Sequence, residues 1–251
     1  MRSCRPDDAA RATVPRMPTA IDFSDVDALT FDCYGTLIDW EAGLSAAFRE
    51  VLEAHDVPHD PEDVLVRFAR QEAAAEAGPY RTYREILMLG LQGVATELDF
   101  EPTANDMERF SRSVEDWPAF PDSTEALRRL KRRFCLGVLT NCDDDLFAAS
   151  NRRLGVDFDW VITAQQVGSY KPNERNFAVM LDRLALPQDR VVHVAQSLFH
   201  DHAPAKRLGY TTVWINRRHD RPGSGATPPS DARPDAVFPD MASFAAAAVP
   251  D

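Results

Sequence analysis

The sequence has little positive charge, few cysteines and no long apolar run. Its 251 residues include 28 Lys and Arg against 40 Asp and Glu, so the formal net charge is −12. Nucleic acids and anionic membranes are bound by clustered Lys and Arg, so we expect neither as a partner. No apolar stretch approaches the roughly 18 residues of a membrane-spanning helix. These features predict a globular protein that binds neither nucleic acid nor membrane.

The cysteines are Cys4, Cys33, Cys135 and Cys142, and they form neither a CxxC pair nor a zinc-finger spacing. We therefore expect reduced thiols in a cytoplasmic protein, with Cys33 and Cys142 as small buried apolar fillers. Residues 1–21 contain arginines but lack the apolar segment of a secretory signal. We expect them to be a flexible lead-in without a function of its own.

A carboxylate directly follows the first apolar segment of the chain. Residues 28–31 (ALTF) are typical of a buried strand, and Asp32 comes next, with a turn at Gly35 and a hydroxyl at Thr36. In open α/β sheets ligands bind at the carboxyl ends of strands, so Asp32 is a candidate site residue. The alternative is a turn aspartate that caps the following segment.

The remaining chain divides into a helical block and an alternating part. Residues 39–115 show helical spacing of apolar residues and no convincing strand, with one helix beginning at Pro61. Beyond them strands and helices alternate, which predicts a parallel, Rossmann-like sheet covered by helices on both faces. We predict a core domain from residues 22–38 and 116–251, with residues 39–115 inserted as a helical domain. The strands expected after the first are 135–139, Trp160–Thr163, Val191–Ala195, Thr211–Ile215 and Ala236–Phe238, and the helices 123–133, 146–154, 172–184 and 203–208, with a surface loop at 222–235.

Further polar residues stand at the ends of these predicted strands or before a helix. They are Thr140, Asn141, Lys171, Gln196, Ser197 and Asp201. An aspartate such as Asp32 can attack an electrophilic carbon or phosphorus and form a covalent intermediate. A nearby lysine would lower its pKa, hydroxyls and an amide would hold an anionic group, and a second carboxylate would activate water.

This set of residues, in this order, resembles the four motifs of the haloacid dehalogenase-like (HAD) hydrolase superfamily. The resemblance covers residues 22–38 and 116–250, and the helical block stands where this family places its cap. It implies that Asp32 is a covalent nucleophile, that Lys171 holds it and that Asp201 serves the water. Thr36, Thr140, Asn141, Gln196 and Ser197 would then bind the substrate or hold Asp32.

Two positions separate phosphatase from dehalogenase within the resemblance. Phosphatases carry an aspartate two residues after the nucleophile, which protonates the leaving group, whereas this chain has Tyr34, a phenol with a pKa near roughly 10. Phosphatases also carry an aspartate for Mg²⁺ where this chain has Gln196. Both positions favour the 2-haloacid dehalogenase (type II) branch and a reaction without a metal cofactor. A weak Mg²⁺ site stays open under the phosphatase alternative.

The helical block contains a further likeness to the dehalogenases, whereas two positions near the motifs differ from them. Arg70-Gln71 resembles an Arg-Gln pair of dehalogenase caps, in which the arginine faces the departing halide. Leu198 stands where these dehalogenases carry an asparagine, and Phe177 where they carry a tyrosine, which puts substrate recognition in question. His200, next to Asp201, either joins in water activation or points to solvent, and we favour solvent.

The sequence therefore predicts a two-domain HAD-type hydrolase that acts on a small 2-substituted carboxylic acid. Asp32 would attack the substituted carbon with inversion, displacing halide or another heteroatom group, with Tyr34 and Arg70 in the substrate pocket. Trp40 and Tyr80 are further candidates for its lining. The alternatives are a Mg²⁺-dependent phosphatase of a small phosphate ester and a catalytically silent binding module of the same fold. A homodimer is possible through an apolar cap face.

Overall fold

The structure is a computed structural model of the chain and describes residues 21–220 and 227–250. Six parallel strands in these residues form one sheet. Their order across the sheet is β3 (Trp160–Thr163), β2 (Cys135–Thr140), β1 (Ala28–Phe31), β4 (Val191–Ala195), β5 (Thr211–Ile215) and β6 (Ala236–Phe238). The predicted strands and the α/β fold class are thus confirmed. Residues 1–20 of the predicted lead-in and 222–226 of the predicted loop lie outside the described residues.

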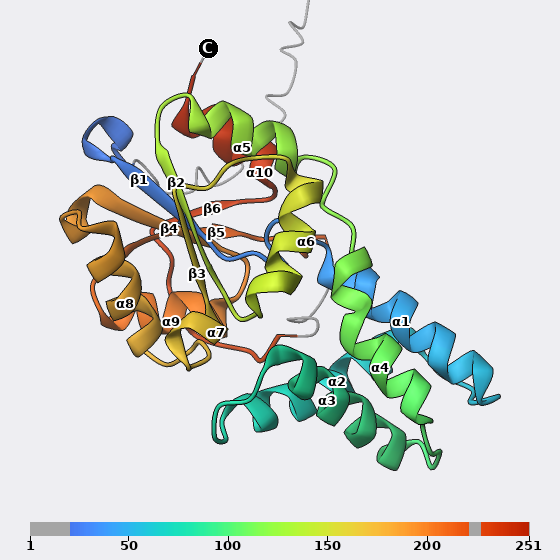
Figure 1. The fold of residues 1–251 in the computed structure, drawn as a ribbon. Coiled ribbons are helices and arrows are strands. Elements are labelled where there is room, and N and C mark those ends of the chain that lie inside the picture. The colour runs from blue at the N-terminus through green and yellow to red at the C-terminus, as the bar shows by residue number, and fades with distance from the viewer. Residues whose placement is uncertain (1–20, 221–226, 251) are drawn as a thin grey trace, which may run out of the picture.

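Helices cover the sheet on both faces (Figure 1). The first face packs against α5 (Ser123–Lys131), α6 (Asp144–Leu154) and α10 (Met241–Ala248), and the second against α7 (Ala164–Val167), α8 (Arg175–Leu184) and α9 (Ala203–Arg207). Within β2, Val138 belongs to the first buried cluster and Leu139 to the second, as the alternation of a strand requires. Both faces are therefore buried, which explains why the strands have nearly continuous apolar sequences.

Some of these helices differ from the sequence prediction, and the short α7 was not predicted. The helix expected at 172–184 begins only at Arg175, whose backbone N–H is bound by the side chain of Asn173. Lys171, expected directly before the helix, consequently lies in an irregular segment that separates it from the helix start. The alanine-rich α10 was not predicted, and it closes the first face against α5 and β6.

Between β1 and β2 the chain forms a separate group of helices, at the lower right of Figure 1. They are α1 (Trp40–Ala54), α2 (Pro61–Glu76), α3 (Tyr83–Glu97) and α4 (Ala104–Arg112). Phe48, Phe68 and Phe110 pack their rings edge to face inside this group. The described residues 39–115 contain no strand. We refer to these helices as the cap.

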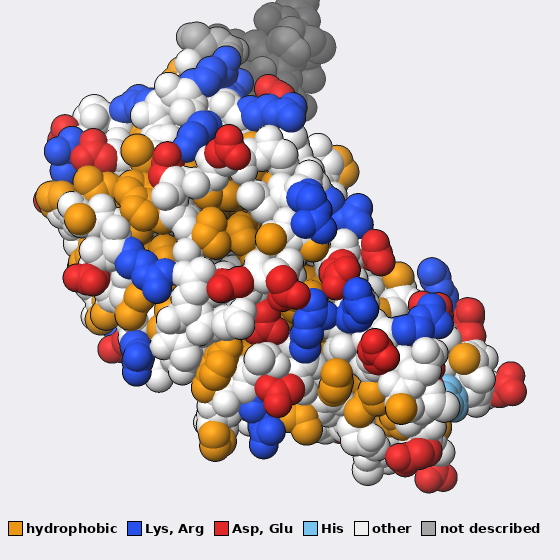
Figure 2. Space-filling view, viewed as in Figure 1, with side chains coloured by type: hydrophobic (Ala, Val, Ile, Leu, Met, Phe, Trp, Pro, Cys, Tyr) orange, Lys and Arg blue, Asp and Glu red, His pale blue; other side chains and the backbone are white. Residues whose placement is uncertain are grey.

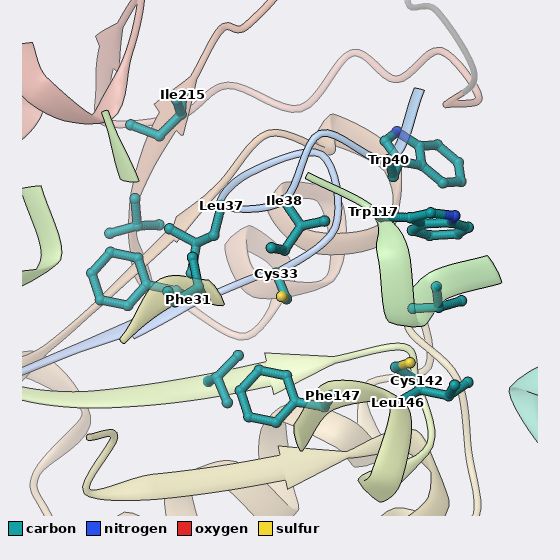
Figure 3. Packing of buried hydrophobic residues seen from close by; sticks show 14 of the residues in the cluster. Phe31, Cys33, Leu37, Ile38, Trp40, Trp117, Cys142, Leu146, Phe147 and Ile215 are labelled. Atoms are coloured by element: carbon teal, nitrogen blue, oxygen red, sulfur yellow. The ribbon is translucent and has the colours of Figure 1, made fainter. Parts of the chain in front are cut away.

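The interior around the first turn contains two of the cysteines. Figure 3 shows Cys33 beside Leu37 and Ile38 and, across from them, Cys142 near α6. Both thiols are free and buried. The prediction that they fill the interior is confirmed.

The surface carries charges of both signs. Figure 2 shows acidic and basic side chains interspersed over core and cap on the face that it draws. Among the helices that the structure describes, none combines the length and the apolar character needed to cross a bilayer.

Three connections meet at the carboxyl ends of the central strands. β1 lies between β2 and β4, where the chain order along the sheet changes direction, and ligands bind at such a switch point. Asp32 follows β1, Asn141 follows β2 and Gln196 follows β4. Gly35 turns the first connection with φ +90°, and an added Cβ there would lie 3.2 Å from the side-chain oxygen of Gln196. Only glycine therefore fits this turn without strain.

The packing of α1 on the returning chain yields a stability prediction. A Cβ on Gly43 would lie 2.3 Å from the ring of Trp117, so Gly43→Ala should destabilise the fold by about 1–3 kcal/mol despite the better helix propensity of alanine. The matched control is Gly78→Ala, whose Cβ would meet only a carbonyl at 3.4 Å. Urea denaturation measures both variants, and an unchanged midpoint for Gly43→Ala would contradict this packing.

Candidate active site

The carboxylate of Asp32 is held from two sides at the end of β1. Its Oδ1 accepts a hydrogen bond from Lys171 Nζ at 2.9 Å and its Oδ2 accepts one from Thr36 Oγ1 at 2.7 Å. Thr36 is itself oriented, because its Oγ1 accepts the backbone N–H of Gln196. Burial raises the pKa of Asp32, and the Lys171 ammonium opposes that rise. The residue is 6% exposed and lines a pocket, so its carboxylate is fixed yet reachable.

Lys171 is the positive centre of the site. Its ammonium donates to Asp32 Oδ1, to Asp201 Oδ1 at 2.7 Å and to the carbonyl of Leu139 at 2.9 Å. These bonds use all three of its protons. Burial would lower the pKa of Lys171, but the carboxylates of Asp201 and Asp32 outweigh burial and raise it. The lysine therefore remains charged.

Asp201 is fully buried and fixed through only one of its oxygens. Oδ1 accepts from Lys171 and also lies 3.0 Å from Nε2 of His193. Burial raises the pKa of Asp201, but Lys171 and His193 overcome that effect and lower it below its usual range. Oδ2 has no hydrogen-bond partner among the described residues, although the carboxylate lines the pocket. This oxygen is placed to accept a hydrogen bond from a water or a ligand.

Asn141 positions the segment that carries Lys171. Its amide oxygen accepts the backbone N–H of Lys171 at 2.8 Å, and its amide nitrogen donates to the Lys171 carbonyl at 3.0 Å. Ser197 Oγ accepts the backbone N–H of His200 and so begins the turn that leads to Asp201. Asn141, Gln196 and Ser197 line the pocket. Thr140, by contrast, is not among the lining residues, and its buried hydroxyl has no partner in the described part of the chain.

Residues 26–209 match the family model of the haloacid dehalogenase-like hydrolases. The chain belongs to this family of hydrolases.

The chain is similar to dehalogenases and to a nucleotidase. A (S)-2-haloacid dehalogenase of Pseudomonas putida is 24% identical over 87% of this chain and 94% of its own length. The pyrimidine 5'-nucleotidase YjjG of Escherichia coli is 25% identical over 53% of this chain and 61% of its own length. Among solved structures, L-2-haloacid dehalogenase from Xanthobacter autotrophicus with chloropropionic acid covalently bound has a TM-score of 0.73 at 20% identity, covering 88% of this chain and 97% of that one.

In this haloacid dehalogenase-like hydrolase, Tyr34 has its hydroxyl in the interior. The hydroxyl lies 3.0 Å from Ser150 Oγ and accepts a bond from the Cys142 thiol, and the ring packs edge to face on Trp117. Burial, with a smaller contribution from Cys142, raises the pKa of Tyr34 well above its usual range. The phenol therefore keeps its proton at neutral pH.

The sequence prediction for Arg70 is not supported by its position. Its side chain is 63% exposed, pairs with Glu97 at 3.0 Å and is absent from the pocket lining. Helix α2 buries Phe68, Ala69 and Glu72, and this register turns Arg70 outward. The Arg-Gln resemblance thus identified the helix but not the face of it that meets the pocket.

The structure also places the other aromatic and imidazole groups that the sequence singled out. His200 does not point to solvent: it lines the pocket, 3.8 Å from Glu76, and burial lowers its pKa to about 4, so it is neutral at pH 7. Trp40 lines the pocket, whereas Tyr80 stacks on Tyr170 in an adjoining groove. Phe177 is buried against the ring of His193 rather than in the site.

The sequence reading missed two sets of residues. The first is His193, whose Nδ1 forms a hydrogen bond with Thr30 Oγ1, so that buried hydrogen bonds connect β1 through β4 to Asp201. The only sign of it in the sequence was a histidine inside an apolar strand. From the cap, Glu72 and Glu76 enter the pocket, and Tyr83 donates to Glu72 at 2.8 Å. Glutamates four residues apart share one helix face, but which face turned inward was not evident.

The buried charges yield a prediction about Lys171. Lys171→Met leaves two carboxylates without their cation and should cost about 3–5 kcal/mol of stability at pH 8. The loss should shrink as pH falls: without the ammonium, burial raises the pKa of the two carboxylates, so they take up protons at a pH where wild-type Asp201, whose pKa is lowered, stays ionised. Denaturation at pH 8 and pH 4 measures it. Lys131→Met, which breaks an exposed pair with Asp159, is the control at about 0–1 kcal/mol, and equal losses for both lysines would contradict this account.

Proposed function

We propose that this hydrolase cleaves a carbon–halogen bond, or another carbon–heteroatom bond, through an ester on Asp32. One carboxylate oxygen attacks the substituted carbon, the carbon–heteroatom bond breaks with inversion, and the leaving group departs with the electron pair. Lys171 and Thr36 hold the carboxylate in line. The proposed substrate is a small 2-substituted carboxylic acid or a close derivative, the class after which the dehalogenase relatives are named. We propose that no metal takes part.

The second step hydrolyses the ester. A water attacks the carbonyl carbon of esterified Asp32, and the bond from that carbon to the substrate oxygen breaks, which releases a hydroxylated product. Oδ2 of Asp201 is a buried acceptor that can orient the water. The proton passes to Asp201 or to His200, whose neutral imidazole lines the same pocket.

The state of Tyr34 is the observation that carries the choice of leaving group. Tyr34 stands at the position where a phosphatase of this family needs a proton donor. Its hydroxyl, however, contacts Ser150 and Cys142, and its pKa is raised. Such a phenol is a poor acid toward an alkoxide. Halide needs no proton on departure, so this position supports carbon–halogen cleavage over phosphate ester hydrolysis.

The variant Tyr34→Phe tests whether the Tyr34 hydroxyl takes part in proton transfer. We expect kcat to stay within about threefold of wild type, because the hydroxyl takes no part in proton transfer, while stability falls by about 1 kcal/mol with the lost hydrogen bonds. Steady-state assay on whichever 2-substituted substrate turns over measures the effect. A loss of about 10²-fold or more in kcat would identify Tyr34 as a proton donor and contradict the proposal.

A substrate panel separates the proposed function from its alternatives. We expect halide release from small 2-halogenated acids and their amides or amines, unaffected by EDTA and abolished in Asp32→Asn. Turnover of p-nitrophenyl phosphate that needs Mg²⁺ would instead support the phosphatase alternative. No turnover of any substrate, with ligand binding unchanged in Asp32→Asn, would support a silent binding module.

A further inference from the structure

Two carboxyl groups of the cap line the pocket that holds Asp32. Glu72 and Glu76 lie one turn apart on α2, and both line the pocket with Lys171 and Asp201. Glu72 is 5% exposed, and the Glu76 side chain is 6% exposed. Acidic side chains are rarely so buried without a partner of opposite charge, so their presence calls for a function.

No lysine or arginine within the described residues forms an ion pair with either group, although the Lys171 ammonium opposes the rise in the pKa of Glu76 from a distance. Lys171 is the one basic lysine or arginine among the described lining residues, and its three protons already bind Asp32, Asp201 and the Leu139 carbonyl. His200, 3.8 Å from Glu76, is neutral at pH 7. Arg70 pairs with Glu97 outside the pocket. A substrate carboxylate would therefore meet two acids and no available cation.

The two cap acids also have unused hydrogen-bonding capacity. Glu72 accepts one bond, from Tyr83. Glu76 lies 3.4 Å from the amide nitrogen of Asn141, which already donates to the Lys171 carbonyl. A carboxylate can accept about four hydrogen bonds, so both groups can receive further donors from a ligand. Oδ2 of Asp201, buried and unpartnered among the described residues, is a third open acceptor in the same pocket.

The groove beside the pocket combines a carboxylate with aromatic rings. It shares Glu76, Lys171 and His200 with the pocket and is further lined by Tyr80, Tyr170 and Phe199. Tyr80 and Tyr170 stack with ring centroids 5.5 Å apart. Aromatic faces together with carboxylates are the surroundings in which proteins bind ammonium groups.

We propose that Glu72 and Glu76 determine substrate specificity by binding a cationic nitrogen group of the substrate, of the ammonium or amidinium class. This inference rests on the proposed function, since the bound nitrogen would lie on the molecule whose carbon Asp32 attacks. The substrate then carries an amine or amidine near its leaving group, in place of or in addition to a carboxylate.

The proposed cation site predicts the direction of proton exchange when a ligand binds. Burial raises the pKa of Glu72 to about 7, against the Tyr83 bond, and raises that of Glu76 well above its usual range, with Glu72 adding to the rise. The other ionisable groups that line the pocket with them are Asp32, Tyr34, Lys171, Asp201, His200 and Tyr83. Binding a cation lowers both glutamate pKa values and releases protons near pH 7, whereas binding a carboxylate would take protons up.

The experiment uses unreactive probes of matched shape, n-propylammonium and propionate, on the full chain at pH 7. Calorimetry in two buffers of different ionisation enthalpy measures affinity and proton exchange, and thermal shift measures binding independently. We expect n-propylammonium to bind at least about tenfold more tightly than propionate, with proton release, and Glu72→Gln and Glu76→Gln each to weaken it about tenfold or more. Glutamine keeps the acceptor for Tyr83, so the fold should persist. Glu62→Gln, on the exposed start of α2, is the control and should change nothing.

Tighter binding of propionate, proton uptake, no binding of n-propylammonium, or unchanged binding in both glutamine variants would each overturn the inference. These outcomes are separable from the proposed chemistry. Plain 2-haloacids that turn over through Asp32 without dependence on Glu72 or Glu76 would leave the ester mechanism standing and reject the cation site. Binding of n-propylammonium without turnover of any halogenated amine, amide or acid would support the cation site and reject the mechanism.

Discussion

The Lys171 ammonium between the carboxylates of Asp32 and Asp201 is the interaction on which the site depends. Two buried carboxylates close to each other repel strongly, and both can ionise only because one cation donates to each of them. The fold supplies this arrangement from three separate connections, at β1, before α8 and after β4. Asn141 fixes the lysine backbone, while Thr30 and His193 anchor Asp201 from inside the sheet. Misplacing any one of them would leave a buried charge unpaired.

The same constraint bears on the proposed substrate. Because Lys171 has no proton left to donate, the core side of the site, as far as the structure describes it, offers a carboxylate and further acceptors but no free lysine or arginine. The cap then adds Glu72 and Glu76 rather than an arginine. Under the proposed function, cleavage and substrate recognition are divided between the two groups of residues: the core contributes Asp32, Lys171 and Asp201, and the cap contributes the two carboxyl groups.

The core was largely predictable from the sequence for a physical reason. Strands buried on both faces appear in the sequence as short apolar runs. A polar residue directly after such a run lies at the carboxyl end of the strand, as Asp32, Asn141 and Gln196 do. Lys171 could be assigned only through the order of the motifs, since an isolated lysine before a helix is usually solvated.

The cap was predictable as helices but not in its orientation. An amphipathic pattern places residues on one face of α2 without showing which partner that face meets, so Arg70 was assigned to the pocket and Glu72 and Glu76 were overlooked. His193 was missed because strand patterning treats a histidine in an apolar run as an exception rather than as an anchor. Contacts of this kind depend on packing between segments that are far apart in the chain.

The central claim is that Asp32 becomes covalently attached to the substrate, and a single turnover in ¹⁸O-enriched water tests it most directly. If water attacks the carbonyl of an Asp32 ester, the label enters the Asp32 carboxylate and the first product carries an unlabelled oxygen. Mass spectrometry of the peptide that contains Asp32 should therefore show the added mass. Label found in the product and absent from Asp32 would mean that water attacks the substrate directly, and the covalent account would be wrong.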